Sequence, residues 1–245
     1  MGDQFTMRTL LLVSAVAAAA FASAQPVAKG FTYGRVDDTL PWKHLGWYDQ
    51  NRFLLFDAEL NGLSARSIEQ RYAVLAASNR FAKVWTNEEN EKPLAAQSKA
   101  WTAAHPQSGL GKKVFQYGGP YVTASGLMPP VSSMRSSAGF IHGGRKYSLE
   151  LTQRADGPWE KDPDANPGFR RANFTLRMRQ GVGNWLSLQD DGKRYPREAL
   201  QYGIDQVWIS PNGKTLAVYL TAYTCGFFEG WNVAIERMVV TGRLP

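Results

Sequence analysis

Alternation between apolar and polar residues predicts β-strands along most of this chain. The segment NFTLRMR sets three apolar residues against three polar ones: Phe174, Leu176 and Met178 against Thr175, Arg177 and Arg179. This is the period of a strand with one buried face. Residues 146–151 alternate in the same way, so we expect the face that carries Lys146, Ser148 and Glu150 to be wet. Residues 53–56 are apolar on both faces and predict a strand covered on both sides.

Turn-forming residues divide these strands into hairpins. Asp49-Gln50-Asn51, Ser78-Asn79 and Gly143-Gly144 each separate two runs of strand length, and Asn and Gly tolerate the positive φ angles of tight turns. In the segment WISPNGKTLAVYL, Ser210-Pro211-Asn212-Gly213 fits a type I turn, with Pro at its second position and Gly in the following bulge. We therefore expect the chain to reverse before Leu216.

One short helix is expected at residues 93–104. Pro93 suits a first helical position, and His105-Pro106 ends the segment. Residues 109–137 are rich in Gly, Pro and Ser and predict a long irregular connection that carries an edge strand. Three residues of the helix share the face that would dock on a sheet: Leu94, Ser98 and Trp101.

The composition agrees with a β-rich fold. The chain is 12% aromatic and contains 23 Gly and 13 Pro, and it has roughly ten strand-like segments. We expect a mainly β fold: one β-rich domain over residues 25–245, a sandwich or a set of incomplete propeller-like sheets, with one short docked helix.

The first 24 residues have the features of a signal peptide. Arg8 precedes an apolar run that ends at Phe21, and the small residues Ala22-Ser23-Ala24 follow. A dozen helical residues rise about 18 Å, short of the roughly 30 Å of a bilayer core. We expect cleavage before Gln25, export, and a periplasmic, cell-envelope or extracellular location without a transmembrane segment. Whether translation starts at Met1 or Met7 stays open.

Segments of this chain resemble two groups of known proteins. LGWYDQNRFLLFDAEL laid against VWISPNGKTLAVYLTA pairs Trp47 with Ile209 and Leu54 with Leu216, and the second segment resembles the Ser-Pro-Asp-Gly turns of exported β-propeller repeats. A propeller needs such units about every 40–45 residues, so a coincidence of two amphipathic hairpins stays open.

The segments RYAVLAASNRFAKVWTNEENEKPLAAQSKA and YGIDQVWISPNGKTLAVYLTAYTCGFFEGWNVAIERMVVTGRL are similar to a bacterial family of predicted secreted proteins with a domain of unknown function. Asn212 stands where that family has Asp, and CGFFEG carries an extra Phe. The resemblance implies export and a β-rich fold, and it implies no activity.

Catalytic and metal-binding patterns are weak. There is no Gly-x-Ser-x-Gly segment, and a thiol–imidazole pair of the single Cys225 with His44 or His142 is not indicated by spacing. Asp162, Asp164 and Asn166 resemble the start of a calcium loop, but Pro167 stands where that loop needs Gly. No cofactor is expected. A glycosidase would need two facing carboxylates, and the candidates that lie on or near strands are Glu59, Glu150, Asp205 and Glu229.

The strongest functional pattern is aromatic and basic. The net charge of +7 favours anionic partners, and flat rings beside cations stack on sugars or on apolar partners. The candidate binding residues are Phe227, Phe228, Trp231, Trp42, Trp47, Arg177 and Arg179. We therefore expect an exported, non-catalytic cell-envelope protein that presents aromatic and basic loops to a partner protein or an anionic envelope polymer, and no specific nucleic acid. The alternative is a secreted hydrolase that acts on envelope polysaccharide through paired carboxylates.

Overall fold

The computed structural model describes residues 43–61, 67–87, 92–117, 135–158, 170–191, 201–225 and 233–245. These residues form thirteen β-strands and one α-helix, and their strand pairings are antiparallel. The prediction of a mainly β fold with one short helix is confirmed for this part of the chain.

The strands make three sheets. The helix-side sheet has the order β4-β3-β2-β1-β5, with β1 Lys43–Tyr48, β2 Phe53–Asn61, β3 Ser67–Leu75, β4 Arg80–Thr86 and β5 Gln107–Gly109. The middle sheet has the order β13-β12-β11-β6, with β6 Lys112–Gln116, β11 Gln201–Ile209, β12 Thr215–Cys225 and β13 Val233–Arg243. The outer sheet has the order β10-β9-β8-β7, with β7 Arg135–His142, β8 Arg145–Pro158, β9 Arg170–Gln180 and β10 Leu186–Asp190.

The four hairpins expected from turn residues are present. Their turns have positive φ where the sequence supplies Asn or Gly, at Asn51, Asn79, Gly143, Gly144 and Gly213. In the Ser210 turn, the Gly213 backbone N–H donates to the Ser210 carbonyl oxygen at 2.8 Å, and Ile209 pairs with Leu216. The edge strand expected within residues 109–137 is β6, which pairs with β11.

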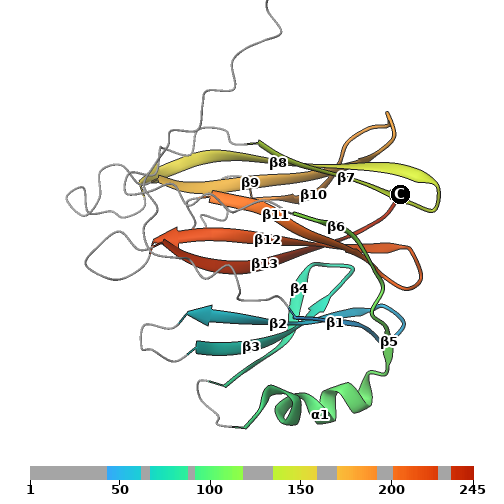
Figure 1. Ribbon diagram of the computed structural model, residues 1–245, viewed down its shortest axis with the longest axis vertical. Coiled ribbons are helices and arrows are strands. Elements are labelled where there is room, and N and C mark those ends of the chain that lie inside the picture. The colour runs from blue at the N-terminus through green and yellow to red at the C-terminus, as the bar shows by residue number, and fades with distance from the viewer. Residues whose placement is uncertain are drawn as a thin grey trace, which may run out of the picture.

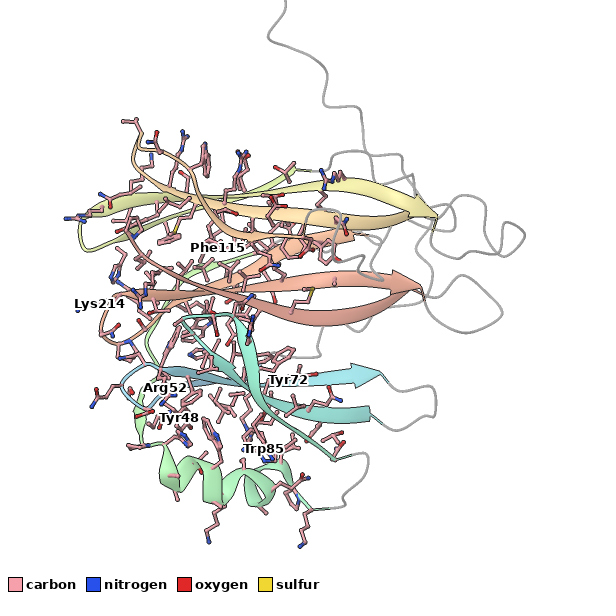
Figure 2. The ribbon with its side chains drawn as sticks, turned by 180° about the vertical axis from the view of Figure 1, so that it is seen from behind. Tyr48, Arg52, Tyr72, Trp85, Phe115 and Lys214 are labelled. Carbon is pink, nitrogen blue, oxygen red and sulfur yellow. The ribbon has the colours of Figure 1, made fainter. Side chains whose placement is uncertain are left out.

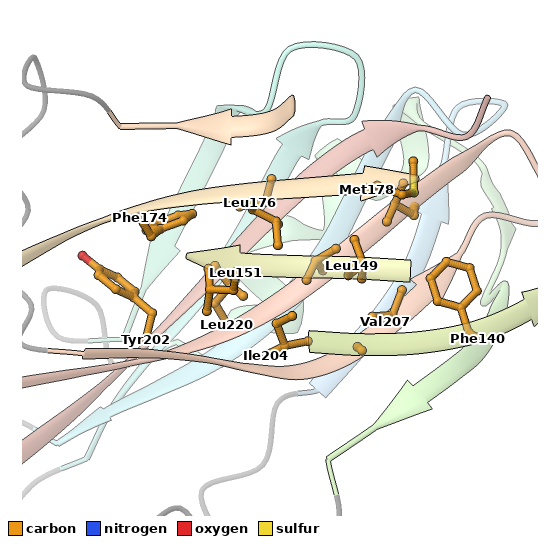
Figure 3. Close-up of a cluster of buried hydrophobic side chains, with 14 of the residues drawn as sticks. Phe140, Leu149, Leu151, Phe174, Leu176, Met178, Tyr202, Ile204, Val207 and Leu220 are labelled. Carbon is orange, nitrogen blue, oxygen red and sulfur yellow. The ribbon is translucent and has the colours of Figure 1, made fainter. Parts of the chain in front are cut away.

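The sheets stack face to face, with the middle sheet between the other two (Figure 1). Strand β12 explains why this order is stable, because its residues 216–220 are all fully buried. Leu216, Val218 and Leu220 pack into the core of the outer sheet (Figure 3), and Ala217 and Tyr219 pack into the core of the helix-side sheet. A continuous apolar run is what a strand buried on both faces requires, and burying each large aliphatic side chain stabilises the fold by about 1.5–3 kcal/mol.

Helix α1, Leu94–Ala104, covers the far face of the helix-side sheet (Figure 1). Leu94 and Ser98 are buried, and the Trp101 ring lies 5.8 Å from the Tyr48 ring and 5.7 Å from the Trp85 ring. Figure 2 shows Tyr48 and Trp85 on this side of the sheet. Pro93, the predicted first helical residue, is instead the N-cap, so the helix begins one residue later at Leu94, and His105 is the C-cap. The predicted docking face is thus confirmed.

No helix within the described ranges is long and apolar enough to cross a membrane. The predicted signal peptide lies outside the described residues.

Candidate functional site

Two of the candidate binding residues lie together on strand β9. Phe174, Leu176 and Met178 point into the core and are at most 2% exposed, so the alternation of a strand places Arg177 and Arg179 on the opposite, outward face of the outer sheet. The pairing of β9 with β8 and of β8 with β7 shows which residues of the neighbouring strands share this outward face. Arg179 pairs with Ser148 and Ser148 with Gly139, while Arg177 pairs with Glu150 and Glu150 with Ser137.

Trp185 completes this group of side chains. The β9–β10 turn brings its ring back over the arginines, with the Arg179 Cζ atom 4.6 Å and the Arg177 Cζ atom 5.6 Å from the ring centroid. A guanidinium stacked on an indole is attracted to the ring and loses rotamer freedom before any ligand arrives. Sequence reasoning missed Trp185. The available signal was the Gly-rich segment QGVGNW directly after the two outward arginines, which returns an aromatic ring to the same face.

Arg177 is engaged with a buried carboxylate. Its Nη2 atom donates to Glu150 Oε1 at 2.6 Å, and the side chains of Arg177 and Glu150 are 40% and 8% exposed. The prediction that Glu150 lies on a wet face is therefore wrong at this residue, because the side chains above it shield it from water. Arg179 makes no ion pair with any described residue.

Glu150, Arg179 and Trp185 border an open groove of about 570 Å³. Gly139 keeps it open, because a Cβ added there would meet only the Tyr147 carbonyl oxygen, at 3.8 Å. We call it the arginine groove, and the described residues that line it are Ser137, Ala138, Gly139, Ser148, Leu149, Glu150, Arg179 and Trp185. Its guanidinium group and serine hydroxyl groups can bind a polar, anionic ligand.

Among the aromatic candidate binding residues, Trp47 is the one that the structure describes. Trp47 is fully buried between the helix-side and middle sheets, so its prediction as a residue presented to a partner is wrong. It belongs to strand β1 and not to a loop. The remaining candidate binding and calcium residues lie outside the described residues: Trp42, Phe227, Phe228, Trp231, Asp162, Asp164 and Asn166.

His44 has a structural role. Its Nδ1 and Tyr219 Oη lie 2.8 Å apart, its Nε2 and the Leu110 carbonyl oxygen 2.7 Å apart, and its ring stacks on Trp208 at 3.9 Å. A carbonyl can only accept, so Nε2 carries the proton, and Nδ1 accepts from the tyrosine. Burial lowers the pKa of His44 to about 4, although the bond to Leu110 opposes this shift. The imidazole is neutral at physiological pH.

Within the described ranges, no group of three or more His, Cys, Asp and Glu residues is placed to hold a metal ion. The side chain of Cys225 lies outside the described residues. The thiol–imidazole pair therefore stays untested.

No protein-family model, curated protein or solved structure matches this chain. The resemblances to a secreted bacterial family and to propeller repeats stay predictions.

Proposed function

We propose that this protein is an exported, non-catalytic binding protein of the cell envelope that holds an anionic envelope polymer in the arginine groove. The observation that carries the proposal is the presence of Arg179 and Trp185 in the lining of that groove, with the Arg177 guanidinium beside the same ring. Arg179 supplies guanidinium donors that no described carboxylate occupies, and guanidinium groups match the planar geometry of carboxylate and phosphate groups.

The lining favours a polymer over a folded partner protein. Protein interfaces depend on large apolar anchors at their centre, whereas the lining of this groove includes the small residues Ser137, Gly139 and Ser148. Serine hydroxyls suit the hydroxyl groups of sugars, and a volume of about 570 Å³ lies in the range of small-molecule sites. We therefore infer that the ligand is an acidic polysaccharide, a chain of hydroxylated rings with carboxylate or phosphate groups.

The hydrolase alternative has less support. Glu150 is the one carboxylate among the described lining residues, and it is ion-paired with Arg177. A glycosidase needs a second carboxylate and, in general, one that can be protonated. Glu150 supports the placement of the arginine better than proton transfer.

Binding to an acidic polysaccharide, polygalacturonate, tests the groove, with neutral dextran as the reference polymer. We expect Arg179→Ala to weaken binding about tenfold or more, since a hydrogen bond to a charged group contributes about 1.5–3 kcal/mol. We expect Gly139→Leu to weaken binding about as much, because its side chain occupies the space of the ligand. Gly139→Leu fills the groove without changing the charge. Affinity electrophoresis at low and high salt measures both effects.

Arg154→Ala is the matched control, because Arg154 is an exposed residue of strand β8 outside the groove lining. It removes the same charge as Arg179→Ala, and binding should change less than about threefold. If Arg154→Ala weakens binding as much as Arg179→Ala, attraction by net charge explains the result and the groove is not the site. An absence of binding to polygalacturonate would overturn the proposal.

Export has its own test. The protein recovered from the cells that produce it should begin at Gln25, as measured by mass spectrometry of the N-terminal peptide. An N-terminus at Met1 or Met7 would contradict export by cleavage of this signal peptide.

A further inference from the structure

Four hairpin turns meet at one end of the molecule, on the right in Figure 1. The backbone N–H of Gly181 donates to the Lys146 carbonyl oxygen at 2.8 Å, which joins the β9–β10 and β7–β8 turns. His142 lies against the β11–β12 turn, since its Nε2 would be 3.0 Å from a Cβ on Gly213. We call this region the hairpin end, and it comprises residues 49–52, 141–146, 181–186 and 210–214 with Arg243.

The tips of the hairpin end carry exposed apolar side chains. Val182 is 100% exposed, Ile141 is 67% exposed and Leu186 is 44% exposed. Val182 lies between two glycines in the segment GVGN, where turns usually carry polar residues. Single exposed apolar residues are common, but a group of them on adjoining tips indicates an interaction surface.

Cations surround these tips. The hairpin end contains five exposed basic residues: Arg52, Arg145, Lys146, Lys214 and Arg243. Its one carboxylate is Asp49, and that group already lies 3.7 Å from Arg52 Nη1. The surface is therefore strongly positive.

This basic surface contains a cavity. A cavity of about 540 Å³ lies between the β1–β2 and β11–β12 turns, and its lining includes Arg52, Lys214 and Arg243. Figure 2 shows Arg52 and Lys214 at the same end of the molecule. A cavity with three cations is large enough for a phosphate-bearing headgroup.

We infer that the hairpin end docks on a bilayer of anionic phospholipids. Val182 and Ile141 enter the interface, and the basic residues contact phosphate groups. A bilayer matches both features, because it offers charged headgroups beside an apolar layer. A soluble polyanion would match the cations but would leave the apolar tips in water.

The docking surface differs from the arginine groove. The two surfaces adjoin, and Trp185 belongs to both the hairpin end and the groove lining. The other lining residues are 137–139, 148–150 and Arg179, and none of Val182, Ile141, Arg145 and Lys146 is among them. The inference therefore does not depend on the proposed polymer binding.

Co-sedimentation of the full chain with vesicles tests the docking. We expect binding to vesicles of phosphatidylcholine with phosphatidylglycerol and not to phosphatidylcholine alone. The double variant Val182→Ser with Ile141→Thr keeps the charge and should lower partitioning at least about fivefold. Arg145→Gln with Lys146→Gln should lower it by a similar factor and reduce its salt dependence.

Matched controls lie outside the hairpin end. Phe81→Ser removes a side chain that is 64% exposed, and Lys83→Gln with Lys99→Gln removes two exposed cations of β4 and α1. Both should leave partitioning within about twofold of the unchanged protein. The groove variants Arg179→Ala and Gly139→Leu should also bind vesicles normally, so docking and polymer binding can fail separately.

Insertion of Val182 and Ile141 into the lipid layer can be measured separately from vesicle binding. The unchanged protein should raise the surface pressure of an anionic lipid monolayer, and the Val182→Ser, Ile141→Thr variant should not. If the protein does not bind anionic vesicles, or if the controls weaken binding as much as the tip variants, the docking inference is wrong. Binding without any rise in pressure would overturn insertion and leave adsorption by charge.

Discussion

The two outermost sheets of the sandwich each carry an arginine–carboxylate pair on the face turned away from the middle sheet, but helix α1 covers only one of them. On the helix side, Arg71 Nε and Nη2 donate to the two Asp57 carboxylate oxygens at 2.6 and 2.8 Å. Its Nη1 donates to Ser98 Oγ of α1 at 2.7 Å. On the outer sheet, Arg177 donates to Glu150 at 2.6 Å, and a single tryptophan ring lies beside it.

This difference separates a structural pair from a pair beside the groove at which we propose ligand binding. Arg71 is 8% exposed, and its three donor atoms all have partners within the fold. Arg177 is half-exposed and stands beside Arg179, which has no described ionic partner. A guanidinium saturated by its own protein stabilises the fold, and one left open to solvent can recognise a ligand.

The largest effect is expected for the covered pair. Asp57→Ala leaves the buried Arg71 guanidinium without its counter-charge, and the free energy of unfolding should fall by about 3–5 kcal/mol. Urea denaturation measures this. Arg52→Ala is the control, because the Arg52–Asp49 pair is exposed and its loss should cost less than about 1 kcal/mol. Equal losses for the two variants would contradict the distinction between covered and exposed pairs.

The free energy of unfolding should also depend on pH, because of His44 in strand β1. The pKa of His44 is about 4 in the folded protein and about 6.5 in the unfolded chain, so between these values the unfolded chain binds the extra proton. The free energy of unfolding therefore falls as pH falls from about 6.5 to 4, by up to about 3 kcal/mol.

His44→Gln isolates this effect. Its amide can still bond to Tyr219 but does not titrate, whereas the carboxylates titrate equally in both proteins. Urea denaturation at several pH values should give curves that converge toward pH 4. Parallel curves would show that His44 does not cause the pH dependence.

An intermediate effect is expected for the open pair. Arg177→Ala leaves Glu150 with one partner fewer at a site where its side chain is 8% exposed, and the loss should be about 1–3 kcal/mol. Adding Glu150→Gln should recover part of that loss, because an amide costs less to bury than a carboxylate. If the double variant is less stable than Arg177→Ala, the buried charge is not the cause.

Local patterns in the sequence predicted the hairpins and the strand faces because these depend on neighbouring residues. Asn79, Gly143 and Gly144 supply their own turn geometry, and the apolar run of residues 216–220 requires cover on both faces. The sequence does not disclose which sheet provides that cover, because stacking joins segments far apart in the chain. For the same reason, the burial of Glu150 and of Trp47 could not be predicted.

The candidate site was accessible to sequence reasoning only in part. The alternation in NFTLRMR placed Arg177 and Arg179 outward, but the groove also needs the small residue Gly139, two strands away. Trp185 reaches the arginines only because the β9–β10 turn folds back over the sheet. The sequence pattern therefore favoured other aromatic residues in loops over Trp185.

The smallest effect on stability is expected at the residue with the largest proposed effect on binding. Arg179→Ala removes a cation 4.6 Å from the Trp185 ring, an interaction of about 0.5–1 kcal/mol where solvent still reaches the pair, and breaks no described ion pair. Its free energy of unfolding should therefore stay within about 1 kcal/mol of the unchanged protein, while affinity for polygalacturonate falls about tenfold. Arg179→Lys keeps the charge but not the planar donors, so its affinity should lie between the two. A loss of stability as large as that of Asp57→Ala would make Arg179 a structural residue like Arg71, and the contrast between the two faces would fail.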